Sequence, residues 1–103
     1  MMDPFSNKRR HIGREDAEQL AIEALSFLAA EEARFVRFLG ITGTDLASIR
    51  AEAGSPHFLA GVLEFLLNDE SLLLVFSAHS GIDPATVAAA RAELAPDPAA
   101  EWG

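Results

Sequence analysis

Apolar residues recur every three or four positions along most of the chain, which is the spacing of one face of an α-helix. The pattern predicts a first helix over residues 14–29, with its glutamates largely off the apolar stripe. It predicts a second, short helix over residues 31–39, ended by Gly40 or Gly43. The stripe of the first helix contains Ala17, Leu20, Ala21, Ala24, Leu25 and Leu28.

Helix start and stop signals divide the remaining chain into four further helices. Ser55 followed by Pro56 is typical of a helix start, because proline at the first helical position loses no hydrogen bond. Asp45 and Asp83 are expected to act as N-caps. The third helix follows Asp45 and ends at Gly54, the fourth runs from Pro56 to Leu67, the fifth begins after Asn68 or Asp69 and ends near Gly81, and the sixth runs from Pro84 to about Leu94.

The helical pattern also repeats once, because residues 20–53 align without a gap on residues 58–91. Such a period is typical of one supersecondary unit packed on its own copy. The sequence therefore predicts an all-α fold, a compact bundle of about six short helices in two degenerate three-helix repeats. The matching residues are Leu25, Phe27, Leu28, Glu32, Phe38, Gly43, Asp45, Ala47 and Ala51 in the first copy and Leu63, Phe65, Leu66, Glu70, Phe76, Gly81, Asp83, Ala85 and Ala89 in the second.

The two copies differ in their middle helices. Residues 72–76 are apolar without interruption, whereas the second helix carries Arg34 and Arg37 on the side opposite its aromatic residues. A helix without a polar face is expected to be buried on every side. The fifth helix is therefore expected to run through the middle of the domain, covered by the alanine stripe of the first helix. The alternative is that its Leu72 and Val75 face meets a partner or a second copy of the chain.

In the third helix, the helical spacing places one apolar stripe toward the core. Leu46, Ile49 and Ala53 are the residues expected to point inward.

Composition and charge limit the function classes. The 103 residues are half hydrophobic, contain no cysteine and carry a net charge of −8. The absence of cysteine suits a reducing compartment, and acidic residues interrupt the most apolar stretch, so the chain is interpreted as cytoplasmic rather than membrane-spanning. An acidic body repels phosphate backbones, which argues against nucleic acid as a partner. Residues 1–13 are expected to form a flexible basic arm, residues 14–95 a single helical domain and residues 96–103 a flexible tail.

No pattern in the sequence indicates catalysis. The histidines His11, His57 and His79 are scattered without the spacing of a metal site, so neither a metal nor a cofactor is expected. Residues 40–45 follow a helix rather than a strand and lack the lysine of a phosphate-binding loop. Residues 77–87 resemble a helix-turn-helix, but the helix after the turn offers mostly alanine to DNA. The chain is therefore interpreted as non-enzymatic.

Three runs of sequence, residues 20–28, 37–43 and 58–70, are followed by Gly-Ile-Asp-Pro at residues 81–84. Together they resemble the alphaproteobacterial family catalogued as domain of unknown function 3572, over residues 14–94 and in that family's order and spacing. The chain departs from the family where the second helix begins, with Glu31, Glu32 and Ala33 in place of the usual Asp-Pro. The resemblance implies an all-helical bacterial cytoplasmic domain, and it brings no activity, cofactor or catalytic residue.

Two functions from different classes remain. The first is a protein-interaction or adaptor module whose surface includes Leu72, Val75, Arg34 and Arg37. The alternative is a small apolar-ligand-binding or accessory subunit, with a cavity among Phe27, Leu63, Phe65 and Phe76. The protein partner is not identifiable from the sequence, and a monomer or weak homodimer is expected.

Overall fold

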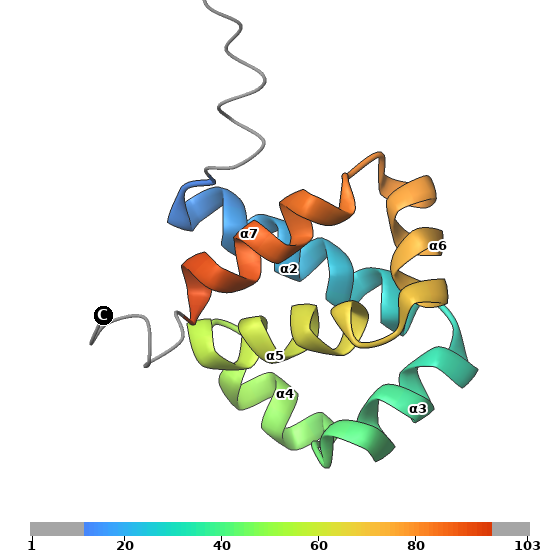
Figure 1. Cartoon of the computed structure of the whole chain (residues 1–103). Coiled ribbons are helices and arrows are strands. Elements are labelled where there is room, and N and C mark those ends of the chain that lie inside the picture. Colours follow the sequence, from blue (N-terminus) through green and yellow to red (C-terminus); the bar gives the residue numbers. More distant parts are fainter. Residues whose placement is uncertain (1–11, 96–103) are drawn as a thin grey trace, which may run out of the picture.

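The computed structural model describes residues 12–95, in which six α-helices are joined by short connections (Figure 1). The predicted flexible tail, residues 96–103, lies outside the described residues, as do residues 1–11 of the predicted flexible basic arm, residues 1–13. The helices are α2 (Arg14–Ala29), α3 (Glu32–Thr42), α4 (Leu46–Glu52), α5 (Pro56–Leu67), α6 (Glu70–Ser80) and α7 (Pro84–Leu94).

The helix boundaries follow the capping signals in the sequence. The side chains of Asp45 and Asp83 accept hydrogen bonds from backbone N–H groups in the first turns of α4 and α7, which confirms both as N-caps. Ser55 and Asp69 do the same for α5 and α6. The second predicted helix is longer than expected, because Gly40 lies within α3 and only Gly43 ends it.

The core of the molecule is built from α2, α5 and α7, which make the most extensive helix–helix contacts. In Figure 1 these helices lie side by side at the centre, while α3, α4 and α6 border them. Aromatic pairs join the outer helices to the centre, with Phe27 edge-on to Phe76 and Phe38 edge-on to Phe65. The largest fully buried side chains are Phe38, Phe76, Leu28, Leu59, Leu63, Leu66, Val62 and Val87.

The expectation that α6 is buried on every side is wrong. Leu73 and Phe76 face the core, but Leu74 is 55% exposed and Val75 47% exposed. The helix borders the core rather than crossing its middle, since its contacts with α5 and α7 are few beside those between α5 and α7. An apolar sequence showed that the helix could be buried, but the other helices cover one side only.

The alanine stripe of α2 does not cover the Leu72 and Val75 face of α6. Ala17, Ala21 and Ala24 are fully buried, and α2 makes its main contacts with α7 and α5. Small side chains allow helices to approach closely, and the helices that pack against this stripe are α7 and α5 rather than α6. The cover expected for α6 within the chain is therefore absent among the described residues.

In α4, the expected inward stripe is also partly wrong. Leu46 is 52% exposed, while Ile49 and Ala53 are half-buried. No residue of α4 is buried, because this seven-residue helix lies at the edge of the molecule. Its stability therefore rests on its cap and a few half-buried contacts.

The repeat is visible in local structure, but two equivalent three-helix units are not shown. α3 and α6 both end at a glycine with positive φ, Gly43 and Gly81. In the last turns, the hydroxyls of Thr42 and Ser80 donate to the carbonyls four residues earlier. The third helices differ, because α7 packs extensively on α2 and α5 whereas α4 has no comparable contact. The period thus describes helix boundaries, and superposition of the two halves remains a prediction.

Candidate functional site

A groove lies between α3 and α6, and we call it the α3–α6 groove. It has a volume of about 420 Å³, with part of α5 and the turn before α6 contributing to its lining. All four residues proposed from the sequence, Arg34, Arg37, Leu72 and Val75, line it. The complete lining is Arg34, Arg37, Phe65, Asp69, Ser71, Leu72 and Val75.

The groove lies between two helices, α3 and α6, that are each anchored to the core by a buried phenylalanine. Phe38 of α3 is 1% exposed and packs edge-on against Phe65, whose ring centroid is 5.2 Å away. Phe76 of α6 packs on Phe27 of α2 with the same centroid separation. Between these two anchors the helices diverge, and the hollow between them remains open to solvent.

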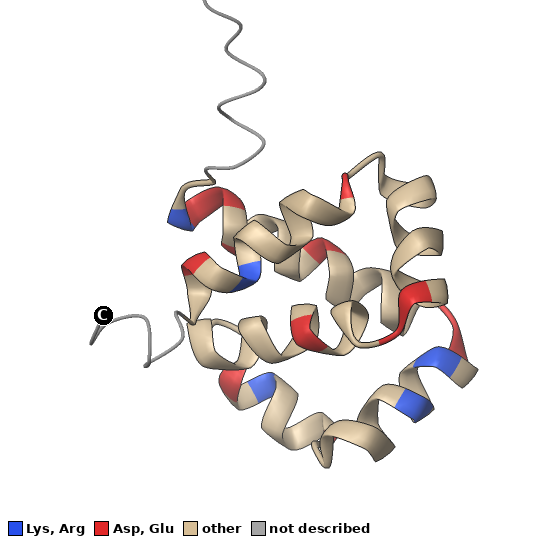
Figure 2. Ribbon diagram, viewed as in Figure 1, with Lys and Arg blue, Asp and Glu red and all other residues tan. Residues whose placement is uncertain are grey.

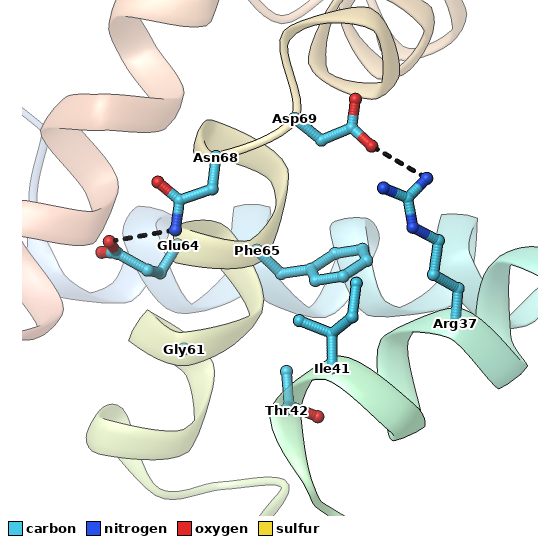
Figure 3. A pocket seen from close by; sticks show the side chains of 8 residues that line it. All are labelled: Arg37, Ile41, Thr42, Gly61, Glu64, Phe65, Asn68 and Asp69. Carbon is cyan, nitrogen blue, oxygen red and sulfur yellow. Dashed lines mark hydrogen bonds and ion pairs between the residues drawn. The ribbon is translucent and has the colours of Figure 1, made fainter.

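One ion pair spans the groove. The guanidinium of Arg37 lies 3.2 Å from a carboxylate oxygen of Asp69 (Figure 3). The Arg37 side chain is 60% exposed and that of Asp69 is 21% exposed, so water screens the pair and its contribution to stability is small. Asp69 is also the N-cap of α6, which accepts the N–H of Leu72 and thereby holds the carboxylate at the groove.

Arg34 lies one helical turn before Arg37 and is positioned differently. Its guanidinium carbon lies 4.2 Å from the centre of the Phe27 ring, a cation–π geometry. Its other polar contacts are long, at 3.5 Å to the Phe27 carbonyl and 3.7 Å to Glu31. The aromatic ring therefore fixes the plane of the Arg34 guanidinium more than any ion pair does.

Two further hollows share lining residues with the groove. One, of about 270 Å³, shares Arg37, Phe65 and Asp69 and extends across α5 past Gly61 (Figure 3). The other, of about 460 Å³, shares Arg34 and Val75 and extends to α2. In Figure 3, Ile41 and Phe65 lie together beside the Arg37–Asp69 pair, so apolar surface adjoins the charges.

Asp69 and Ser71 were not proposed as site residues from the sequence, and Phe65 was expected to line an interior cavity rather than this groove. The apolar spacing of α5 identifies Phe65 as a core residue but does not show that its edge reaches a groove. Asp69 carried a signal, because it precedes the fifth predicted helix as a cap. That it also faces Arg37, more than thirty residues earlier in the chain, depends on tertiary packing.

Within residues 12–95 no three histidine, aspartate or glutamate side chains come together as a metal site. His57 and His79 are exposed, in the first turn of α5 and the last turn of α6, and His79 lies against the Phe27 ring. The groove offers guanidinium groups, one carboxylate, one hydroxyl and apolar surface, which suit binding.

No single helix in the described part of the chain is long and apolar enough to cross a membrane. α6 and α7 reach the necessary length and composition only as a pair, with a bend of 102° between them.

Comparisons with known proteins agree with the family resemblance of the sequence. A family model described as "Protein of unknown function (DUF3572)" matches residues 14–97, which include all six helices and every residue of the groove. Neither the curated proteins nor the solved structures contain a match to the chain. Since the family model covers most of the sequence, the chain belongs to the DUF3572 family of proteins of unknown function.

Proposed function

We propose that this protein is a non-enzymatic interaction module that binds a protein partner in the α3–α6 groove. The observation that carries the proposal is the incomplete cover of α6. Val75 remains 47% exposed on a groove wall, beside half-buried Leu72 and opposite two arginines. Apolar side chains rimmed by charged groups are typical of protein-binding surfaces.

The shape of the site also favours a protein segment over a small apolar molecule. Phe27, Leu63, Phe65 and Phe76 were the residues expected to line an interior cavity, and each is at most 7% exposed. Phe27 and Phe76 contact each other edge to face, and Phe65 contacts Phe38 in the same way. These side chains are packed together in the core, whereas the α3–α6 groove is open to solvent. Helix-in-groove recognition uses such an open channel between two helices.

In this proposal the protein acts in the cytoplasm as a monomer or weak homodimer. It needs no cofactor, nucleic acid or membrane.

Site-specific photocrosslinking in the native cell would test the proposal. A photoreactive phenylalanine analogue is placed at Val75 in one strain and at Leu74 in another. The two positions are neighbours on α6 with similar exposure, but only Val75 lines the groove. We expect a discrete protein adduct from position 75 and none from position 74. Equal adducts from both positions, or none from either, would contradict the proposal.

A further inference from the structure

We propose that the partner segment is amphipathic and acidic, with apolar side chains against Val75 and Leu72 and carboxylates against Arg34 and Arg37. This inference rests on the proposed function, since it specifies the chemistry of the partner in the same groove. The two guanidinium groups retain unused hydrogen-bonding capacity, and the chain as a whole is acidic.

Arg37 has N–H donors that its ion pair with Asp69 does not use. A guanidinium carries five N–H donors, and the ion pair with Asp69 runs from one terminal nitrogen to one carboxylate oxygen. The side chain is 60% exposed and lies at the mouth of the groove. An incoming carboxylate can therefore bind Arg37 without displacing Asp69, and arginine is well suited to such planar pairs.

Arg34 is also positioned to bind a carboxylate of the partner segment. Stacking on the Phe27 ring orients its guanidinium, so less side-chain entropy is lost when a carboxylate binds. The contacts to Glu31 and to the Phe27 carbonyl are long, which leaves the guanidinium weakly paired. Arg34 and Arg37 lie on successive turns of α3, so a helical or extended segment can present carboxylates to both.

The charge around the groove makes this pair of arginines distinctive. The whole chain has 16 acidic residues against 8 lysines and arginines. Figure 2 shows the two basic positions of α3 close together, and acidic residues lie at the N-terminal end of the same helix and at the start of α6. The chain as a whole is acidic, so an acidic segment meets like charge over much of the remaining surface, which disfavours other binding positions. A basic segment would be repelled by Arg34 and Arg37 and could pair only with Asp69 among the residues that line the groove.

Selection from a phage-displayed library of short random peptides tests the inference. Wild-type protein is immobilised, and soluble Val75→Glu protein is added in excess to remove peptides that bind elsewhere. We expect the enriched peptides to combine large apolar residues with aspartate or glutamate and to carry net negative charge. Enriched peptides that are neutral or basic would overturn the inference while leaving the proposed function standing. If every enriched peptide also binds the Val75→Glu protein, both this inference and the proposed function are wrong.

Fluorescence anisotropy with the most enriched peptide then separates the role of the arginines from a general charge effect. The double variant Arg34→Gln/Arg37→Gln should bind it at least about tenfold more weakly, the loss expected for about one charge-assisted hydrogen bond. The matched control is Arg50→Gln, which removes an exposed arginine of α4 outside the groove. Circular dichroism checks that each variant is folded. Equal weakening by Arg50→Gln, or no weakening by the double variant, would show that the groove does not recognise carboxylates.

Discussion

At the scale of single residues, two glycines have a conformation that other residues adopt at a cost. Gly43 and Gly81 end α3 and α6 with φ values of 74° and 79°, in the left-handed region. Their N–H groups donate to Leu39 and Ser77, which satisfies carbonyls at the helix ends. Since these glycines end the two helices that form the groove, they also set where each helix turns away from it.

Alanine substitutions at glycine should therefore have opposite effects at different positions. Gly81→Ala should destabilise the protein by about 1–2 kcal/mol, because a Cβ is unfavourable in the left-handed conformation. Gly40→Ala should instead stabilise it by about 0.5–1 kcal/mol, because Gly40 lies within α3 and an added Cβ has no neighbour within 4 Å. Urea unfolding of both variants measures the difference. The same sign at both positions would contradict this account of the helix ends.

The Asp45 cap predicts a pH effect. The N–H of Ser48 donates to the carboxylate at 2.8 Å, and this hydrogen bond, with others from Ser48 and Ala47, lowers the pKa of Asp45. Because the folded pKa lies below the unfolded pKa of about 3.9, the cap stabilises the protein above that pH. This contribution is lost as the pH falls through the folded pKa.

The variant Asp45→Asn keeps a capping oxygen but does not titrate in this range. We expect wild type to lose stability relative to Asp45→Asn when urea unfolding is repeated at progressively lower pH below about 4. A stability difference that stays constant with pH would show that the carboxylate charge does not contribute.

At the scale of the helix, α6 combines an apolar sequence with two distinct faces. Phe76 is fully buried against Phe27, whereas Leu74 and Val75 are exposed. The composition of α6 does not show which face is buried and which is exposed, because both faces carry large hydrophobic side chains. The buried face holds the helix on the core, and exposed Val75, together with half-buried Leu72, provides the apolar wall of the groove.

Alanine substitutions on opposite faces of α6 should separate these roles. Phe76→Ala should cost about 3–5 kcal/mol, as expected for removal of a buried aromatic ring. Leu74→Ala should change stability by no more than about 0.5 kcal/mol, because the side chain is mainly in water. Chemical unfolding compares the two variants. A comparable loss for Leu74→Ala would mean that this face of α6 is covered in solution.

At the scale of the whole molecule, stability is concentrated in three helices. α2, α5 and α7 contain most of the buried residues and share the most extensive contacts. α3 and α6 have one or two buried residues each, and α4 has none. The groove is thus formed by the less strongly anchored helices, which could adjust to a partner with little cost to the core.

Native-state hydrogen exchange should reveal this hierarchy. Amides of α2, α5 and α7 should exchange most slowly, those of α3 and α6 at intermediate rates, and those of α4 fastest. The measurement is made by mass spectrometry on the full chain. Protection of α4 equal to that of α5 would contradict the picture of a three-helix core with attached outer helices.

Much of the secondary structure could be predicted because its causes lie close together in the sequence. Asp45, Ser55 and Asp83 each cap a helix through a backbone group two or three residues away. Gly43, by contrast, was only one of two candidates for the end of α3. Gly40 has an equally suitable residue type but continues the helix, since the choice between them depends on local backbone energies that the pattern does not resolve.

Four of the residues that line the groove were named from the sequence, but their arrangement in space was not predicted. Leu72 and Val75 were noted because α6 has no polar face, and the expected cover from α2 was wrong. That Arg34 and Arg37 lie opposite them could not follow from helical periodicity, which describes one helix at a time. The pairing of Arg37 with Asp69 arises only when α3 and α6 are both placed on the core.

The sequence by itself determined the all-α class, the six helices and most of their ends, because helix formation and capping depend on neighbouring residues. It also determined the family, because the family model matches the sequence over residues 14–97. The tertiary structure alone decided which apolar faces meet. α7 rather than α6 packs extensively against α2, because side-chain packing between distant segments selects one arrangement among several that satisfy the same apolar pattern.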